Sequence, residues 1–102
     1  MKNKILMFTV LCAFFIGAGE SMAGGNIKAG KIKSSTCATC HGSTGQGSAD
    51  APKLAGLDEA YIKKQLEDFK SGARKNKMMN MFSGNLDHMD MADLALYYSS
   101  LK

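Results

Sequence analysis

The feature that most constrains this chain is a pair of cysteines with a histidine directly behind it: Cys37, Cys40 and His41. The chain has 102 residues and three cysteines, and the third, Cys12, lies in an apolar N-terminal run. A domain this short is marginally stable on side-chain packing alone and usually relies on a disulfide, a metal, a cofactor or a partner. The cysteine pair is therefore the expected attachment point of whatever completes the core.

Residues 1–23 have the features of a secretory signal sequence. Two lysines precede a mostly apolar stretch over residues 5–19, and Ser21-Met22-Ala23 places small residues at the positions that a signal peptidase reads. That stretch is shorter than the roughly 20 residues that a membrane-spanning helix needs. We expect cleavage before Gly24 and export to the periplasm of one domain, residues 24–102, without a membrane span.

The charge of this mature domain is modest. Removing residues 1–23 leaves 11 basic and 8 acidic side chains, a formal charge of +3. This charge is too small, and too little interleaved with aromatic residues, to indicate nucleic-acid binding. It fits transient docking on an acidic patch of a partner protein. Six basic residues cluster on and after the middle of the domain, and most of them are expected to face solvent: Lys63, Lys64, Lys70, Arg74, Lys75 and Lys77.

Several interpretations of the cysteine pair compete. A structural zinc site or an iron–sulfur cluster needs further ligands, and the mature domain offers only His88 besides His41. A thioredoxin-like redox pair needs a βαβ context, and no strand pattern is visible. A plain disulfide with a chance histidine is the remaining alternative. The spacing is that of covalent c-type haem attachment, so it predicts one haem c, held by thioethers from Cys37 and Cys40 and ligated by His41.

The second axial ligand of such a haem is a separate question. A thioether in that position makes an electron-transfer site, and an open position binds small ligands. Met89 and Met91 lie in a helical pattern, and His88 at the first turn of that helix is expected to be exposed. The stretch 75–85 is predicted to be looser, and spacing alone leaves its three methionines open as candidates: Met78, Met79 and Met81.

The secondary-structure pattern predicts an all-α fold. One short helix is expected from residue 27 to about residue 39, and a second from an N-cap at Asp58 to a terminal Gly72. Asp87 is the expected cap of a last helix. Its apolar stripe, which we assign to ordinary core packing, contains Met91, Leu94, Ala95, Tyr98 and Leu101.

Residues 24–102 resemble a small class I cytochrome c of the c-553 type found in bacterial periplasms. The motifs that carry the resemblance occur in family order over essentially the whole mature domain: Cys37–Gly42, Pro52–Gly56, Tyr61–Leu66, Phe69–Arg74 and Asp90–Tyr98. The resemblance implies three to five short helices around one haem. It also implies a monomeric one-electron carrier, not an enzyme, that docks transiently on redox partners such as membrane-bound oxidase or reductase complexes.

The resemblance also assigns residues to the haem. In this family the axial methionine falls seven residues before the hydrophobic residue that precedes the last helix. Here that residue is Leu86, which selects Met79 as the iron ligand, with Met78 and Met81 as neighbouring alternatives.

Three further contacts are implied by the same family. The Pro52 carbonyl is expected to accept a hydrogen bond from His41, which fixes the orientation of the imidazole. Gly30 is expected to let the first and last helices cross closely, with Tyr97 against it. Arg74 is a candidate partner for a haem propionate.

Two other functions stay open at this stage. One is the haem subunit of a redox enzyme such as a peroxidase, although the chain offers no distal acid–base set. The other is a gas-binding or sensor module, which needs a vacant or labile sixth position on the iron. An optical spectrum distinguishes both from an electron carrier.

Overall fold

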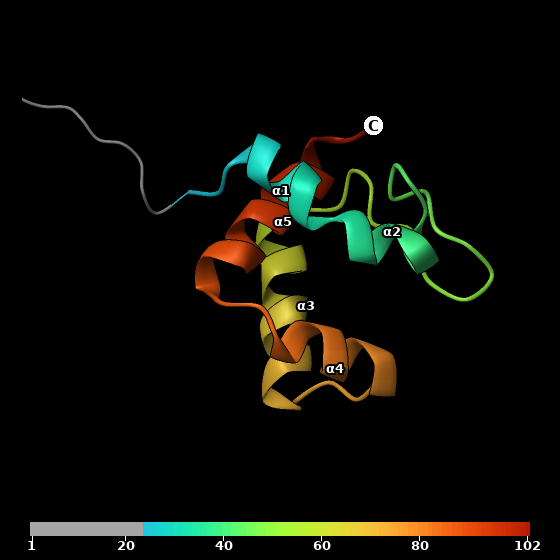
Figure 1. Cartoon of the computed structure of the whole chain (residues 1–102), viewed down its shortest axis with the longest axis vertical. Coiled ribbons are helices and arrows are strands. Elements are labelled where there is room, and N and C mark those ends of the chain that lie inside the picture. The colour runs from blue at the N-terminus through green and yellow to red at the C-terminus, as the bar shows by residue number, and fades with distance from the viewer. Residues whose placement is uncertain (1–23) are drawn as a thin grey trace, which may run out of the picture.

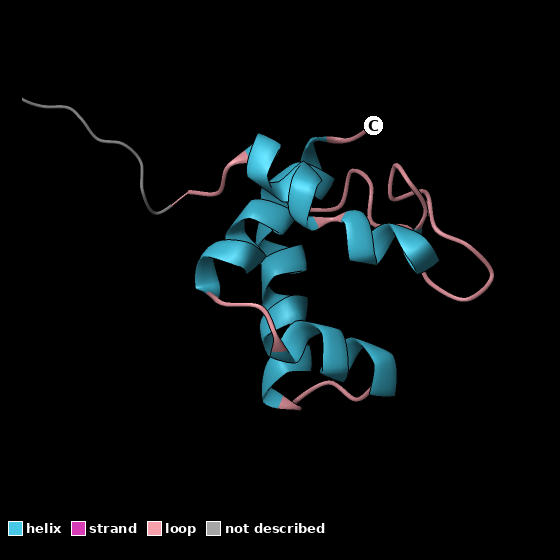
Figure 2. Ribbon diagram, viewed as in Figure 1, coloured by secondary structure: helices cyan, strands magenta, loops and turns pink. Residues whose placement is uncertain are grey.

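The computed structural model describes residues 24–102, so the expected signal sequence lies outside the described residues. The described chain forms five helices and no strand (Figures 1 and 2). The helices are α1 Ile27–Lys33, α2 Ser35–His41, α3 Glu59–Ser71, α4 Lys77–Gly84 and α5 His88–Ser100. The all-α expectation is confirmed. No helix within residues 24–102 is long and apolar enough to cross a bilayer.

Helices α1 and α5 cross at Gly30. A Cβ atom added there would lie 2.1 Å from the carbonyl oxygen of Asp93 and 2.6 Å from the Cβ of Tyr97. Both distances are far below van der Waals contact, so only glycine allows the two helices to approach this closely. The expected crossing, with Tyr97 against Gly30, is confirmed. Figure 1 shows α1 beside α5.

A buried carboxylate fastens the same two helices together. Asp93 is 3% exposed and accepts hydrogen bonds from the backbone N–H of Asn26 at 2.8 Å and from Lys33 Nζ at 2.6 Å. Lys33 also pairs with Asp90 at 2.9 Å. Its hydrogen bonds to Asp93 and Asp90 raise the pKa of Lys33. The backbone N–H of Asp87 and, after it, the Lys33 ammonium lower the pKa of Asp90.

Helix α3 begins and ends where the sequence predicts, and α5 begins at its predicted cap. The Asp58 side chain accepts from the N–H of Tyr61 at 3.0 Å, and Gly72 ends α3 with a left-handed φ of 88°. Asp87 and Asp90 cap α5 reciprocally through each other's backbone N–H groups. These caps satisfy N–H groups that a helix start otherwise leaves unpaired.

The first predicted helix is in fact two. Ser34 separates α1 from α2, and its hydroxyl donates to the carbonyl of Lys31 at 2.7 Å. A serine that bonds back to its own turn bends a helix, which accounts for the break. Helix α2 then continues to His41, beyond the expected end near Thr39, so the whole cysteine–histidine motif stands on one helix.

The prediction of a looser stretch over residues 75–85 is wrong, because it contains α4. The Asn76 side chain caps this helix by accepting from the N–H of Met79 at 3.0 Å. The Asn80 amide donates to the carbonyls of Phe69 and Arg74, each at 2.8 Å, and so anchors α4 to the end of α3. Met78 and Met81 do stand at helical spacing, but the Asn80 bonds that anchor α4 form only in the folded chain, and the sequence pattern did not reveal them.

Candidate haem site

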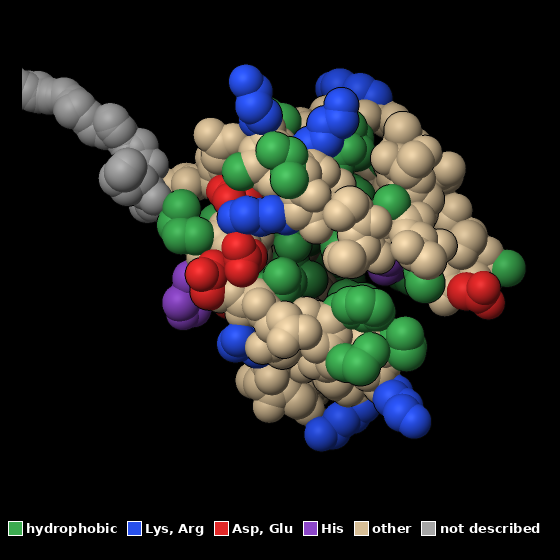
Figure 3. Space-filling model, viewed as in Figure 1, with side chains coloured by type: hydrophobic (Ala, Val, Ile, Leu, Met, Phe, Trp, Pro, Cys, Tyr) green, Lys and Arg blue, Asp and Glu red, His purple; other side chains and the backbone are tan. Residues whose placement is uncertain are grey.

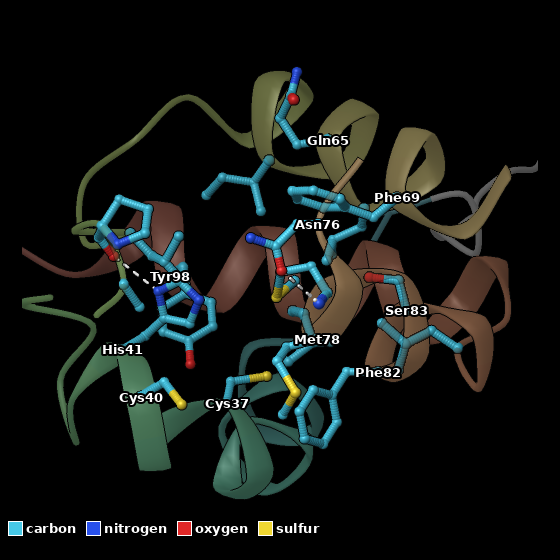
Figure 4. Close-up of a pocket in the computed structure, with 18 of the residues that line it drawn as sticks. Cys37, Cys40, His41, Gln65, Phe69, Asn76, Met78, Phe82, Ser83 and Tyr98 are labelled. Carbon is cyan, nitrogen blue, oxygen red and sulfur yellow. Dashed lines mark hydrogen bonds between the residues drawn. The ribbon is translucent and has the colours of Figure 1, made fainter. Parts of the chain in front are cut away.

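One face of α2 presents the two cysteines and the histidine. Cys37 lies three residues before Cys40 and four before His41, a spacing that puts all three side chains on the same side of a helix. Figure 4 shows them along one wall of a cavity. His41 is only 7% exposed, whereas Cys37 is half-buried and Cys40 exposed, and both thiols are free. Burial raises the pKa of the Cys37 thiol.

The His41 ring is held by the loop that follows α2. Its Nδ1 lies 2.8 Å from the carbonyl oxygen of Pro52, as drawn in Figure 4. A carbonyl accepts but never donates, so this contact requires the proton on Nδ1 and leaves the Nε2 lone pair available to a metal ion. The N–H of Gly47 donates to the His41 carbonyl at 2.7 Å, and the N–H of Leu54 donates to the Gly45 carbonyl at 2.8 Å, so the loop is itself fastened.

The cavity in front of His41 has a volume of about 430 Å³ and receives side chains from α2, α3, α4, α5 and the loop over residues 50–57. This is the size range of sites for cofactors and other small organic molecules. Figure 3 shows it as a hollow in the surface with hydrophobic side chains on its rim. Much of its lining is apolar, including Leu54, Ile62, Leu66, Phe69 and Leu94. The described core is correspondingly small, with five buried members in its main cluster.

Two methionines of α4 stand in the wall of this cavity. Met78 and Met79 both line it, whereas Met81 is absent from the lining and is 55% exposed. Met89 and Met91 on α5 do not line it either. Of the three predicted candidates, Met78 and Met79 therefore line the cavity. Met79 is half-buried, and Met78 is 50% exposed.

Two buried hydroxyls also face the cavity without a partner. Among the buried side-chain nitrogen and oxygen atoms of the described residues, those without a hydrogen bond are Ser83 Oγ and Tyr98 Oη, and both residues line this cavity. Burial of the Tyr98 ring raises the pKa of its phenol. Buried polar groups are almost always paired in complete proteins, so these hydroxyls fit a site that holds a further group. Sequence analysis missed Ser83 altogether, since its position depends on the unrecognised α4.

The two remaining predicted candidates, His88 and Arg74, differ in whether they line the cavity. His88 is exposed at the start of α5 and does not line the cavity. Arg74 does line it, where its guanidinium stacks over the Phe69 ring at 4.6 Å and donates to the Gln65 side chain at 2.6 Å.

Comparison with known proteins gives a consistent family. The family model for Cytochrome c matches residues 27–102. Cytochrome c4 of Pseudomonas aeruginosa is 39% identical over 101 residues, which cover 98% of this chain and 49% of that protein. The thiosulfate dehydrogenase electron acceptor of Thiomonas intermedia is 38% identical over 104 residues, covering all of this chain and 48% of that protein.

A solved structure agrees with these relatives. Cytochrome c4 of Acidithiobacillus ferrooxidans superposes with a TM-score of 0.73 at 38% identity, over 76% of this chain and 51% of that one. The chain thus spans about half the length of the relatives it matches. Membership of the c-553 type, in contrast, stays a prediction. The helical fold, the cysteine–histidine motif on α2 and these similarities agree that the chain belongs to the cytochrome c family, whose prosthetic group is a covalently bound haem c.

Proposed function

We propose that this protein is an exported one-electron carrier with one haem c, attached through Cys37 and Cys40 and ligated by His41 and Met79. The observation that carries the proposal is the cavity between α2 and α4, which has an oriented imidazole on one wall and a half-buried thioether on another. When bound, the haem gains or loses a single electron at its iron. The chain's own residues attach it, ligate it and keep water from it.

Met79 is a better ligand than Met78 on two grounds. Its side chain is the more buried of the two, and a sulfur shielded from water binds iron with less competition from solvent. Its backbone N–H is also held by the Asn76 cap, and Asn80 fixes the same turn of α4 to α3. These bonds limit the movement of the helix that supplies the sulfur.

The setting of this carrier is part of the same proposal. The signal features of residues 1–23 support export to the periplasm. Two relatives are described as thiosulfate dehydrogenase electron acceptors, which supports a redox enzyme as the electron donor. In this setting the protein exchanges electrons with partner proteins and transforms no substrate itself.

The decisive experiment replaces the proposed axial ligand. Met79→Ala should remove the weak far-red sulfur-to-ferric-iron absorption and lower the reduction potential, because a thioether favours ferrous iron. It should also let the ferrous protein bind carbon monoxide, which the intact site should refuse.

Two control variants test the choice of methionine. Met89→Ala alters a half-exposed methionine outside the cavity and should leave the spectrum intact. Met78→Ala should also keep the far-red band, and loss of the band in this variant alone would move the ligand by one residue. If the wild-type protein binds carbon monoxide readily, its sixth position is open, and the sensor or enzyme alternative replaces the electron carrier.

A further inference from the structure

Helix α4, which carries the proposed ligand Met79, is attached to the rest of the fold through α3. Among the helices of residues 24–102, α4 packs against α3 and against no other helix (Figure 1). It has eight residues, and a helix this short is not stable alone in water. The position of the Met79 sulfur therefore depends on the contacts between α4 and α3.

The charges within α4 do not favour the helix either. Its first residue is Lys77, and Lys75 lies two residues earlier, so cations stand at the positive end of the helix dipole. No basic residue lies in its last turn, where a cation would be favourable. The last carbonyls of a helix also lack partners within the helix itself. A cation supplied by another element remedies both deficits.

Lys70, in the last turn of α3, supplies that cation. Its ammonium donates to the carbonyl of Gly84, the last residue of α4, at 3.1 Å and to the carbonyl of Leu86 in the following turn at 2.6 Å. The residue before it, Phe69, accepts a bond from the Asn80 side chain at its own carbonyl, at 2.8 Å. Two adjacent residues of α3 therefore hold α4, one near its middle and one at its end.

We propose that Lys70 is a positioning residue for the sixth ligand, because its two bonds hold the end of α4 and so keep the Met79 sulfur on the iron. The inference rests on the proposed ligation by Met79. When the two bonds break, the end of α4 is free to move away from the cavity, and another ligand can then compete with the thioether. Lys70 does not line the cavity, so it acts through α4 and not on the haem itself.

The experiment titrates the haem-loaded ferric protein with imidazole, which must displace Met79, and follows the loss of the far-red band without denaturant. The apparent affinity for imidazole rises with the fraction of molecules in which the sulfur has left the iron. Lys70→Met keeps the aliphatic stem but loses both donors, and it should raise this affinity by roughly three- to tenfold, the range of modest exposed hydrogen bonds. Before imidazole is added, the band should be intact. Lys70→Arg keeps a cation with several N–H donors and should return the affinity toward wild type.

Two control variants separate this role from general effects. Lys64→Met removes the same charge from the same helix, at a side chain that pairs with Asp68 and not with α4, and it should leave the imidazole affinity unchanged. Gly30→Ala should destabilise the fold at the α1–α5 crossing, away from α4, and it should change the affinity less than Lys70→Met does.

Three results contradict the proposed role of Lys70. One is a wild-type imidazole affinity in Lys70→Met. Another is an equal gain in Lys64→Met or in Gly30→Ala, which would assign the effect to charge or to global stability. The third is a Lys70→Arg protein that behaves like Lys70→Met, because the donors would then have no role. If Met79→Ala keeps the far-red band, the proposed ligand itself is wrong, which is a separate and visible failure.

Discussion

Two regions of the molecule differ in how completely their polar groups are paired and their side chains are buried. One is the crossing of α1 and α5, and the other is the cavity wall formed by α2, α3 and α4. At the crossing the helices touch through Gly30, and the buried carboxylate of Asp93 is paired on both oxygens. Along the cavity, two buried hydroxyls lack partners, and Met78 exposes half of its surface. The first region is specified by the residues of the chain, whereas the second is specified jointly by the chain and the haem.

The largest effect should come from a variant whose cavity wall cannot attach a haem. Replacing both Cys37 and Cys40 with serine removes both thioethers, so no haem should remain on the denatured polypeptide. The apoprotein should be largely unfolded by circular dichroism, because the cavity occupies the centre of a core too small to close alone. A well-folded, haem-free double variant would contradict this and show that the first region suffices for the fold.

The next largest effect should come from separating α1 and α5. Gly30→Ala places a methyl group against the Asp93 backbone, which cannot move aside as a flexible side chain could. We expect a loss of about 3 kcal/mol in the free energy of unfolding, the upper end of the cost of overpacking. Denaturant titration of the haem-loaded protein measures it.

The same substitution at the end of α4, away from the crossing, provides the control. Gly84 ends α4, and a Cβ atom there would meet nothing within 4 Å. Gly84→Ala should therefore be neutral or stabilise the protein by about 0.5–1 kcal/mol, through helix propensity and a less flexible unfolded chain. Equal losses in the two variants would mean that the crossing has no special role.

A smaller effect should come from the charges at the crossing. Lys33→Met leaves the buried Asp93 carboxylate with only the Asn26 N–H, and it should cost about 1–3 kcal/mol at neutral pH. The free energy of unfolding should be measured from acid to alkaline pH for both the wild-type protein and the Lys33→Met variant.

The pKa shifts give the expected shape of that profile. The raised pKa of Lys33 contributes stability that is present below its ordinary value of 10.5 and is lost as the pH rises through the folded value. The lowered pKa of Asp90 contributes stability that is present above 3.8 and is lost as the pH falls through the folded value. In Lys33→Met the alkaline loss due to this lysine should disappear. The acid loss should shrink only in part, because the N–H of Asp87 is the larger cause at Asp90.

The same two regions differ in how far sequence analysis reaches. The caps at Asp58, Gly72 and Asp87 are local features, so both bounds of α3 and the start of α5 could be predicted. The motif on α2 is equally local, because the spacing of its two cysteines and its histidine is enough to predict covalent haem attachment. The close crossing at Gly30 was expected only from the family resemblance.

What could not be predicted depends on contacts between distant parts of the chain. Asn80 fastens helix α4 to carbonyls 11 and 6 residues away. The spacing of apolar residues in the sequence cannot predict such hydrogen bonds. Without α4 in view, the register of Met79 and the position of Ser83 both stay hidden. The contact of His41 with Pro52 likewise spans 11 residues of loop, and only the resemblance suggested it.

The smallest effect concerns the docking of a redox partner. We expect docking at the cavity side of the molecule, where exposed charged side chains have no ion-pair or hydrogen-bond partner within the described chain. The structure divides the predicted lysine cluster. Lys70 donates to the carbonyls of Gly84 and Leu86 at 3.1 and 2.6 Å, and Lys64 pairs with Asp68 at 2.8 Å. The side chains of Lys75 and Lys77 are exposed and take part in none of the hydrogen bonds or ion pairs found in residues 24–102. Figure 3 shows lysine and arginine side chains beyond the apolar rim of the hollow.

Lys75→Glu or Lys77→Glu should therefore slow electron transfer with an acidic redox partner at low salt, by roughly two- to tenfold, and leave the unfolding free energy unchanged within about 0.5 kcal/mol. The difference from wild type should fade as salt screens the encounter, which stopped-flow rates at several ionic strengths can measure. Lys70→Glu should behave differently, because it loses the bonds that hold the α4–α5 turn and should lower stability as well as rate. If Lys70→Glu changes only the rate, its contacts with that turn are dispensable. If the electron-transfer rate depends neither on ionic strength nor on the charge of Lys75 and Lys77, the partner binds instead at the apolar rim around Met78 and Phe82.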